Sequence, residues 1–162
     1  MKAAYNFTGW VLGMLITATA CVSSSSAQEK DSALKALIDA KRYVFIAQSA
    51  TPMGGRFVQL TSDYDLKIRP DSIISFLPYY GRSYSAPLDP SQSGIQFTST
   101  DFEYTQKARK KGGWNIVIKP KDVRDPRQLS LTVSEGGNAT LQVVSNDRQA
   151  ISFNGYIAAK TR

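Results

Sequence analysis

Apolar and polar residues alternate with a period of two along most of the chain after residue 42. In one example Tyr64, Leu66 and Ile68 are separated by charged residues, and the pattern recurs in segments 114–119, 129–133, 139–143 and 151–156. This period places every second side chain on the same face of a β-strand. We therefore expect each of these segments to be a half-buried strand.

Short polar turns join the expected strands. Asp71-Ser72 follows Pro70 and reverses the chain, and Glu135-Gly136-Gly137-Asn138 supplies the paired glycines that tight hairpins need. No helical crossover separates the strands, so they should form an antiparallel sheet. We expect about eight to ten strands in a strongly curled sheet, which is a half-barrel or flattened barrel. A two-layer β-sandwich is the alternative.

One short helix is expected before the sheet. Asp31 or Ser32 can cap a helix that runs to about Lys41, in which three apolar residues form one stripe: Leu34, Leu37 and Ile38. Segment 42–49 follows and is rich in strand-forming residues. The helix should pack on the sheet and cover one opening or edge of the barrel.

The first 27 residues resemble an export signal. Lys2 supplies a positive start, residues 7–18 are uncharged and apolar, and Ala18-Thr19-Ala20 forms a small-residue cleavage pattern before Cys21. The apolar stretch is shorter than the roughly 20 residues that span a bilayer. We expect residues 1–27 to be a signal peptide and serine-rich tether, and residues 28–162 to be a single β-rich domain.

Two cleavage sites lead to different products. Cleavage before Cys21 would follow a pattern like a bacterial lipobox and would leave a thiol that carries lipid. Cleavage after Ala27 would discard Cys21 with the leader. The chain has a single cysteine, so no internal disulfide can form.

The composition excludes several classes of function. The formal net charge is +7, and loss of a leader that contains Lys2 and no acidic residue would lower it by one. A basic domain can bind nucleic acid, but an exported one would not meet it. The chain has no histidine, which is the commonest general base and zinc ligand. We therefore expect no enzyme, no cofactor and no metal site.

Three weaker motifs have ordinary explanations. Ser32-Ala33-Leu34-Lys35 matches the Ser-x-x-Lys of penicillin-recognising enzymes, but Ser32 already serves as a helix cap. Asp63 and Asp65 could hold calcium, yet carboxylates on the wet face of a strand are common. The basic run 107–111 is typical of a solvated strand end.

The most unusual composition lies in residues 78–87, where three tyrosines and an arginine stand between two prolines: Tyr79, Tyr80, Arg82 and Tyr84. Aromatic faces and a guanidinium suit sugar rings, peptide backbone or anionic headgroups. The same tyrosines could instead plug one end of the barrel. Both interpretations remain open at this stage.

Several sequence blocks resemble domain of unknown function family 4251, whose members are exported proteins chiefly of Bacteroidetes. The blocks are Thr51-Pro52-Met53-Gly54-Gly55-Arg56, residues 77–87, Lys111-Gly112-Gly113 and residues 145–153. The resemblance extends from about residue 33 to residue 157. It implies a mainly β envelope protein and brings no catalytic residues with it. For a protein of this phylum, the serines that follow Val22 in place of acidic residues imply a periplasm-facing location, with a lipid anchor in the outer membrane if Cys21 is acylated.

Three of these blocks place an arginine beside a turn: Arg56, Arg82 and Arg148. Each could bond carbonyl groups and tie a loop to the barrel. Alternatively, the three could converge with Tyr79, Tyr80 and Tyr84 on one ligand. We expect a non-catalytic binding module for a glycan, lipid or protein partner. The alternatives are a structural envelope protein without a ligand and, more remotely, a hydrolase that uses two carboxylates.

Overall fold

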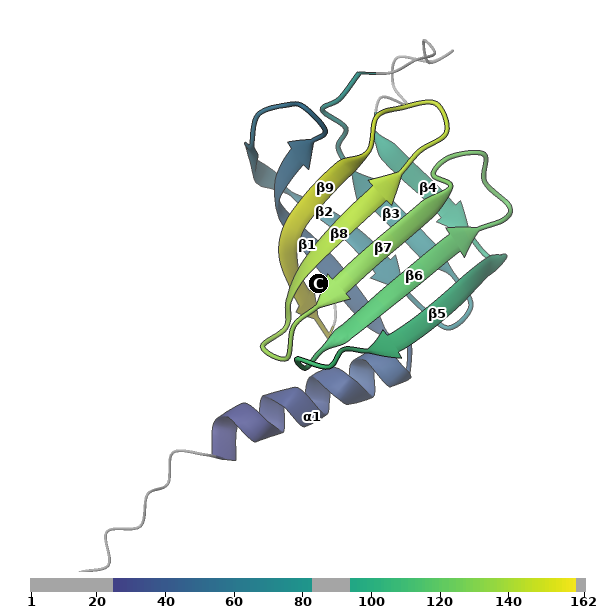
Figure 1. Cartoon of the computed structure of the whole chain (residues 1–162). Coiled ribbons are helices and arrows are strands. Elements are labelled where there is room, and N and C mark those ends of the chain that lie inside the picture. Colours follow the sequence, from purple (N-terminus) through teal and green to yellow (C-terminus); the bar gives the residue numbers. More distant parts are fainter. Residues whose placement is uncertain (1–24, 83–93, 160–162) are drawn as a thin grey trace, which may run out of the picture.

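The computed structural model describes residues 25–82 and 94–159, with side chains from residue 31 onward. These residues form one helix followed by a succession of strands (Figure 1). The elements are α1 (Ser25–Asp39), β1 (Tyr43–Pro52), β2 (Val58–Ile68), β3 (Ile73–Leu77), β4 (Ile95–Ser99), β5 (Phe102–Ala108), β6 (Trp114–Pro120), β7 (Gln128–Val133), β8 (Asn138–Val144) and β9 (Ile151–Ala158).

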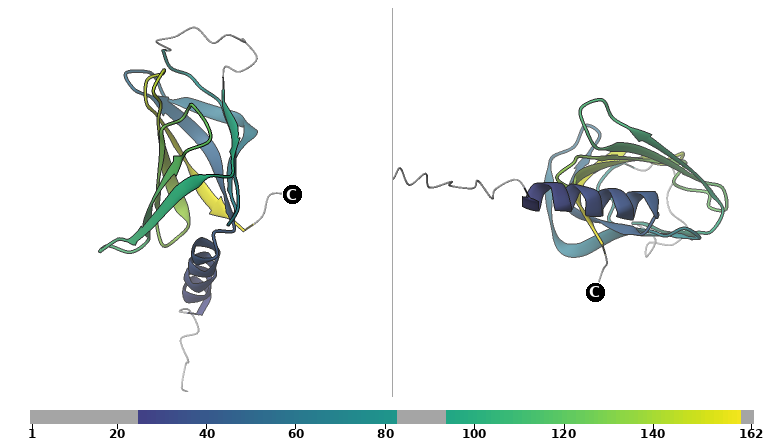
Figure 2. Two further views of the ribbon diagram at one scale, coloured as in Figure 1. Left: turned by 90° about the vertical axis from the view of Figure 1, so that its right-hand side faces the viewer. Right: turned by 90° about the horizontal axis from the view of Figure 1, so that it is seen from below.

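The strands make a single 9-stranded sheet in the order β4-β3-β2-β1-β9-β8-β7-β6-β5, and every neighbouring pair is antiparallel. The edge strands β4 and β5 are separated in the chain only by Thr100 and Asp101. So short a connection cannot cross a flat sheet of this width. The sheet therefore curls until its edges meet at a corner (Figure 2). The expected curled antiparallel sheet is confirmed, and the chain does not form the alternative sandwich.

Asp122, just after β6, fastens the corner between β4 and β5. Its Oδ1 accepts a hydrogen bond from the Ser99 hydroxyl at 2.5 Å, and its Oδ2 accepts from the backbone N–H groups of Thr100 at 2.7 Å and Asp101 at 3.2 Å. These bonds favour the ionised carboxylate, so they lower the pKa of Asp122 from 3.8 to about 2. The Asp122 carboxylate thus holds together the corner at which β4 and β5, the two unpaired edges of the sheet, meet.

The interior of the barrel is filled by apolar side chains from both halves of the sheet. Phe45, Leu66, Leu129, Leu141 and Phe153 have no exposed surface. Four of the five belong to strands whose alternate residues face outward, as the sequence pattern predicts, whereas Phe45 belongs to β1, in which the neighbouring Val44 is buried as well. Burial of this contiguous core is the main favourable contribution to folding.

Helix α1 covers the lower opening of the barrel, as expected (Figure 2). Leu34 and Ile38 are buried in the core cluster, and Leu37 packs against it. The helix ends in a Schellman motif, in which the N–H of Arg42 bonds the carbonyl of Leu37 at 3.0 Å and the N–H of Lys41 bonds that of Ile38 at 3.1 Å. Lys41 accordingly has a φ of 52°.

The helix begins earlier than the sequence indicated. It starts at Ser25, so neither Asp31 nor Ser32 is its N-cap, and residues 25–27 are helical although we assigned them to a tether. Serines favour caps and turns, but residues 27–30 are Ala, Gln, Glu and Lys, which tolerate the helix well. Propagation through these residues outweighs the local preference of the serines.

Asp65 also differs from its expected position. Asp63 is exposed, but Asp65 is 7% exposed and forms an ion pair with Lys67 at 3.3 Å. It lies on the outer face of β2, beside Ile46 of β1 and Phe76 of β3 in the strand register. Bulky neighbours on both sides therefore shield a carboxylate that alternation alone would leave in water.

Candidate functional site

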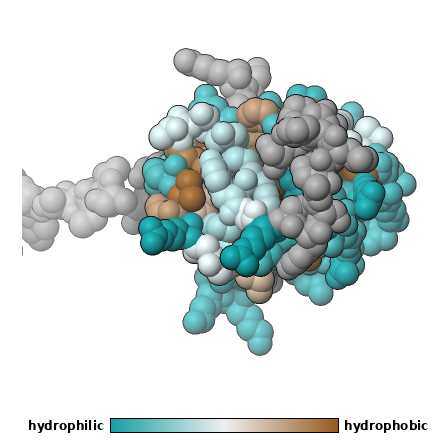
Figure 3. Space-filling model, turned by 90° about the horizontal axis from the view of Figure 1, so that it is seen from above, coloured by the Kyte–Doolittle hydropathy of each residue, from teal (hydrophilic) through white to brown (hydrophobic). Residues whose placement is uncertain are grey.

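Four connections between strands meet at the upper end of the barrel, opposite helix α1 (Figure 1). They are the β1–β2 turn at 53–57, the β3–β4 connection, of which residues 78–82 and 94 are described, and the loops at 121–127 and 145–150. We call these residues the upper rim. Hydrophobic side chains lie among hydrophilic ones on this face (Figure 3).

Tyr79 and Arg148 form the inner part of the upper rim. The Tyr79 hydroxyl donates toward the carbonyl of Arg82 at 2.8 Å and that of Gln149 at 3.1 Å. The guanidinium carbon of Arg148 lies 5.2 Å from the centroid of the Tyr79 ring, and its Nη1 donates to the carbonyl of Gly94 at 3.0 Å. Tyr79 packs against the core. Tyr79 therefore fills the upper end of the barrel, and Arg148 links the neighbouring loops to each other. This structural role is one of the two roles expected from the sequence.

Further bonds join the four connections to one another. The N–H of Gln149 bonds the carbonyl of Arg82 at 3.1 Å, and the carbonyl of Ala150 accepts from the N–H of Met53 at 3.0 Å. Asp147 pairs with Arg124 at 3.3 Å. Loops held by several partners lose little further entropy on binding, so the upper rim is a preorganised surface.

The other predicted site residues divide into separate groups. Tyr80 is 41% exposed and lies near Tyr64, whose ring stacks on Phe76 at a centroid distance of 5.7 Å. The side chains of Arg56 and Arg82 are exposed at the rim. Tyr84 and Cys21 lie outside the described residues. The structure thus brings Tyr79 and Arg148 together, whereas convergence of all six predicted residues on one ligand stays a prediction.

Two rim residues did not figure among the predicted site residues. Met53 is 68% exposed and Phe57 is 61% exposed, and both flank Arg56 in the β1–β2 turn. Single exposed apolar side chains are common, but exposed apolar residues that gather in one place often mark an interaction site. The available signal was the presence of two bulky apolar residues in a turn that contains Gly54 and Gly55.

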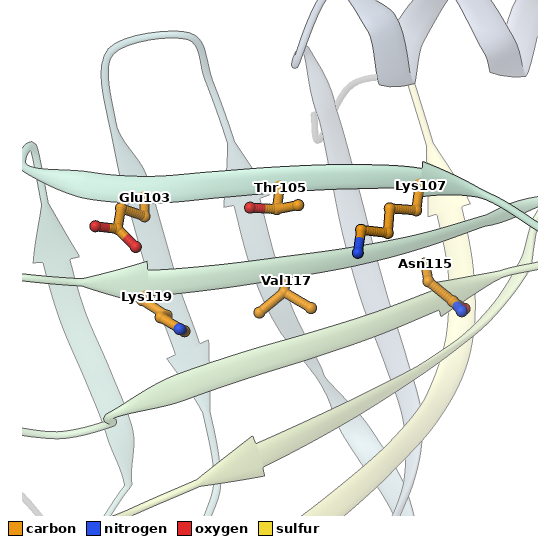
Figure 4. A pocket seen from close by; sticks show the side chains of 6 residues that line it. All are labelled: Glu103, Thr105, Lys107, Asn115, Val117 and Lys119. Carbon is orange, nitrogen blue, oxygen red and sulfur yellow. The ribbon is translucent and has the colours of Figure 1, made fainter.

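Two shallow depressions lie on the outside of the sheet. One has a volume of about 350 Å³ and is lined by β5 and β6 through Glu103, Thr105, Lys107, Asn115, Val117 and Lys119 (Figure 4). The other, of about 420 Å³, lies over β7, β8 and β9, and its lining includes Thr132, Asn138, Thr140 and Asn154. Neither contains a residue of the predicted site.

A family model for a domain of unknown function, DUF4251, matches residues 25–157. The chain belongs to the DUF4251 family. A crystal structure of a DUF4251 family protein from Bacteroides eggerthii is similar to it, with a TM-score of 0.60 and 16% identity over 80% of this chain and 87% of that one. No curated protein matches. At this identity the likeness shows a shared fold, while the match to the family model confirms the family predicted from the sequence blocks.

The DUF4251 fold gives no sign of a metal centre or a membrane helix in the part of the chain that is described. Among residues 25–82 and 94–159, no three acidic, cysteine or histidine side chains cluster as metal ligands would. Within the same residues, no helix is both long and apolar enough to cross a bilayer.

Proposed function

We propose that this DUF4251 chain is an exported, non-catalytic module that docks a protein partner through its upper rim. The observation that carries the proposal is the exposure of Met53 and Phe57, at 68% and 61%, on either side of Arg56. Met, Phe, Tyr and Arg are enriched in protein interfaces. Tyr80 and Arg82 add two further exposed residues of these types to the rim.

The charges of the rim indicate the chemistry of the partner. Arg56, Arg82 and Arg127 form no ion pair with another described residue, while Arg124 is paired with Asp147. An acidic surface around an apolar pocket would complement them. Such complementarity mainly increases the rate and the specificity of association.

The position of α1 favours a protein partner over a lipid. If Cys21 is acylated, the helix that begins at Ser25 follows the anchor after only a few residues. The lower end of the barrel would then lie near the membrane, and the rim at the other end would face away from it (Figure 1). Mass spectrometry of the mature N-terminus distinguishes an acylated Cys21 from a chain that begins at Gln28.

Site-specific photocrosslinking in the producing cells tests the docking surface. A photoreactive residue at Phe57 should give a discrete protein adduct, and the same residue at Gln96 on the outer face of β4 should not. The adduct at position 57 should disappear when Met53→Ser and Arg56→Glu are added. Because these side chains are exposed, the melting temperature should change little.

Equal adduct yields at both positions would contradict the proposal, as would an adduct that survives the two rim substitutions. A structural protein without a ligand is the competing function, which the mutual satisfaction of Tyr79 and Arg148 favours. It predicts no discrete adduct at position 57 and a loss of folding when the Tyr79–Arg148 tie is removed.

A further inference from the structure

The outer face of β7, β8 and β9 carries no charged residue. Every second residue of β7 and β8 is buried in the core, as are Ile151 and Phe153 of β9, and the alternate residues face outward. We call the outward set the neutral face, and it consists of Gln128, Ser130, Thr132, Asn138, Thr140, Gln142, Val144, Ser152, Asn154, Tyr156 and Ala158. Charged residues make up 20% of the chain and normally occupy such wet strand faces. Their complete absence here calls for a reason other than solubility.

Amide and hydroxyl groups cross the neutral face in register. Asn115 of β6 is opposite Thr132, Thr132 is opposite Thr140, and Thr140 is opposite Asn154. The Thr132 hydroxyl donates to Asn115 Oδ1 at 3.3 Å, and the Thr140 hydroxyl donates to Asn154 Oδ1 at 2.9 Å. These bonds orient the side chains within one row that runs across four strands.

The row leaves both donors and acceptors available on its surface. Because Asn115 and Asn154 accept through Oδ1, the amide nitrogen of each points elsewhere, and neither nitrogen has a partner among the described residues. Each threonine oxygen retains lone pairs. Sugar hydroxyls both donate and accept hydrogen bonds, so a surface with free donors and acceptors can pair with them in both ways.

The neutral face is also hollowed and has an aromatic border. The lining of the depression of about 420 Å³ includes Thr132, Asn138, Thr140 and Asn154 of the neutral face, and Arg109 from beyond it. Tyr156, which is 38% exposed, is opposite Asn138 in the register and follows Asn154 by two residues along β9. A tyrosine ring in this position offers a flat apolar surface to a pyranose ring at the end of the row.

We propose that the neutral face binds an uncharged glycan chain laid across the strands. Neighbouring strands are about 4.8 Å apart, which is close to the length of one pyranose unit in an extended chain. Successive sugars can therefore meet Asn115, Thr132, Thr140 and Asn154 in turn. The site lies on the side of the barrel, away from the upper rim, so it extends the function beyond protein docking.

The composition disfavours the other occupants of a sheet face. An anionic glycan would need several cations along the face, but Lys107 and Lys119 line the neighbouring depression, and Arg109 is the one cation that lines the depression over the neutral face. A second copy of the chain or a membrane would need apolar contact area. Val144, Tyr156 and Ala158 are the only apolar residues of the neutral face, and the polar rows separate Val144 at one end from Tyr156 and Ala158 at the other.

Nuclear magnetic resonance titration of the full chain tests the proposal. The probes are cellohexaose, mannohexaose, laminarihexaose and maltohexaose, with hexagalacturonate as the anionic control. At least one neutral probe should give saturable shifts in the backbone amides of Thr132, Thr140 and Asn154. Thr140→Val, which keeps the shape but removes the hydroxyl, should weaken binding about tenfold, whereas Thr140→Ser should retain it.

Added charge provides a second, matched comparison. Asn154→Lys should abolish binding, while Gln96→Lys on the outer face of β4 adds the same charge elsewhere and should leave binding unchanged. The proposal is overturned if no neutral probe saturates or if hexagalacturonate binds as tightly. Shifts in the neutral face that depend on protein concentration without sugar would also overturn it, because they would indicate stacking of two copies.

Discussion

The guanidinium of Arg148 lies over the ring of Tyr79, with its carbon 5.2 Å from the ring centroid and its side chain 16% exposed. The two residues are far apart in the sequence, in the β3–β4 connection and the β8–β9 loop. Arg148 also bonds Gly94 and lies 3.9 Å from Asp125. One side chain thus holds three of the four rim connections together.

Arg148→Ala should therefore lower the free energy of unfolding by about 2 to 3 kcal/mol, because it removes a cation–π contact and a charge-assisted hydrogen bond from a mostly buried site. Chemical denaturation measures the loss. Arg82→Ala is the control, since its side chain is exposed and its loss should cost no more than about 0.5 kcal/mol. Equal losses of stability in the two variants would show that Arg148 does not hold the rim connections together.

Asp122 should make stability fall at low pH. Its pKa in the folded chain is about 2, lowered from 3.8 chiefly by the Ser99 hydrogen bond. A folded-state pKa below the unfolded value contributes stability above the unfolded pKa, and this contribution is lost as the pH falls from about 4 to about 2. Thermal melts of the wild type and Asp122→Asn across this window should show a flatter pH dependence for the variant. Parallel pH profiles would contradict the assignment.

Ile38 should account for much of the stability that α1 contributes. Its side chain has no exposed surface and closes the lower opening of the barrel. Ile38→Ala leaves a cavity there and should cost about 2 to 5 kcal/mol. Lys35→Ala, on the exposed side of the same helix, removes only an ion pair with Asp39, and such a loss should cost about 0.5 kcal/mol or less. Similar melting temperatures for the two variants would mean that the helix does not seal the barrel.

The strands that could be predicted from the sequence share one property: each buries one face in the core and exposes the other. β2, β6, β7 and β8 alternate clearly because inward residues such as Leu66 and Leu141 are fully buried. β5 alternates as well, with Phe102 and Tyr104 packed against the core, but it has no fully buried residue because it is an edge strand. The pairing of β1 with β9 has no local signal at all, because it follows from closure of the sheet.

The candidate site was predictable in its residue types and not in its geometry. Tyr79 and Arg148 stood out as an aromatic residue and a cation beside turns, but only the fold decides that they face each other. Met53 and Phe57 belong to a turn in which apolar residues are usually incidental. Their significance depends on how exposed their side chains are. The alternation of apolar and polar residues predicts exposure within a strand but not in a turn.

Gly155 should be required where β1 and β9 approach most closely. A β-carbon at this position would overlap the backbone carbonyl of Ile46, in the part of β1 where the register shifts between Ala47 and Ser49. Gly155→Ala must therefore push the strands apart and should cost about 2 kcal/mol or more. Gly136→Ala is the matched control, because a β-carbon there meets no atom within 4 Å. Denaturation curves that coincide for the two variants would show that β1 can yield at its bulge, and a large difference would show that the closed barrel depends on this contact.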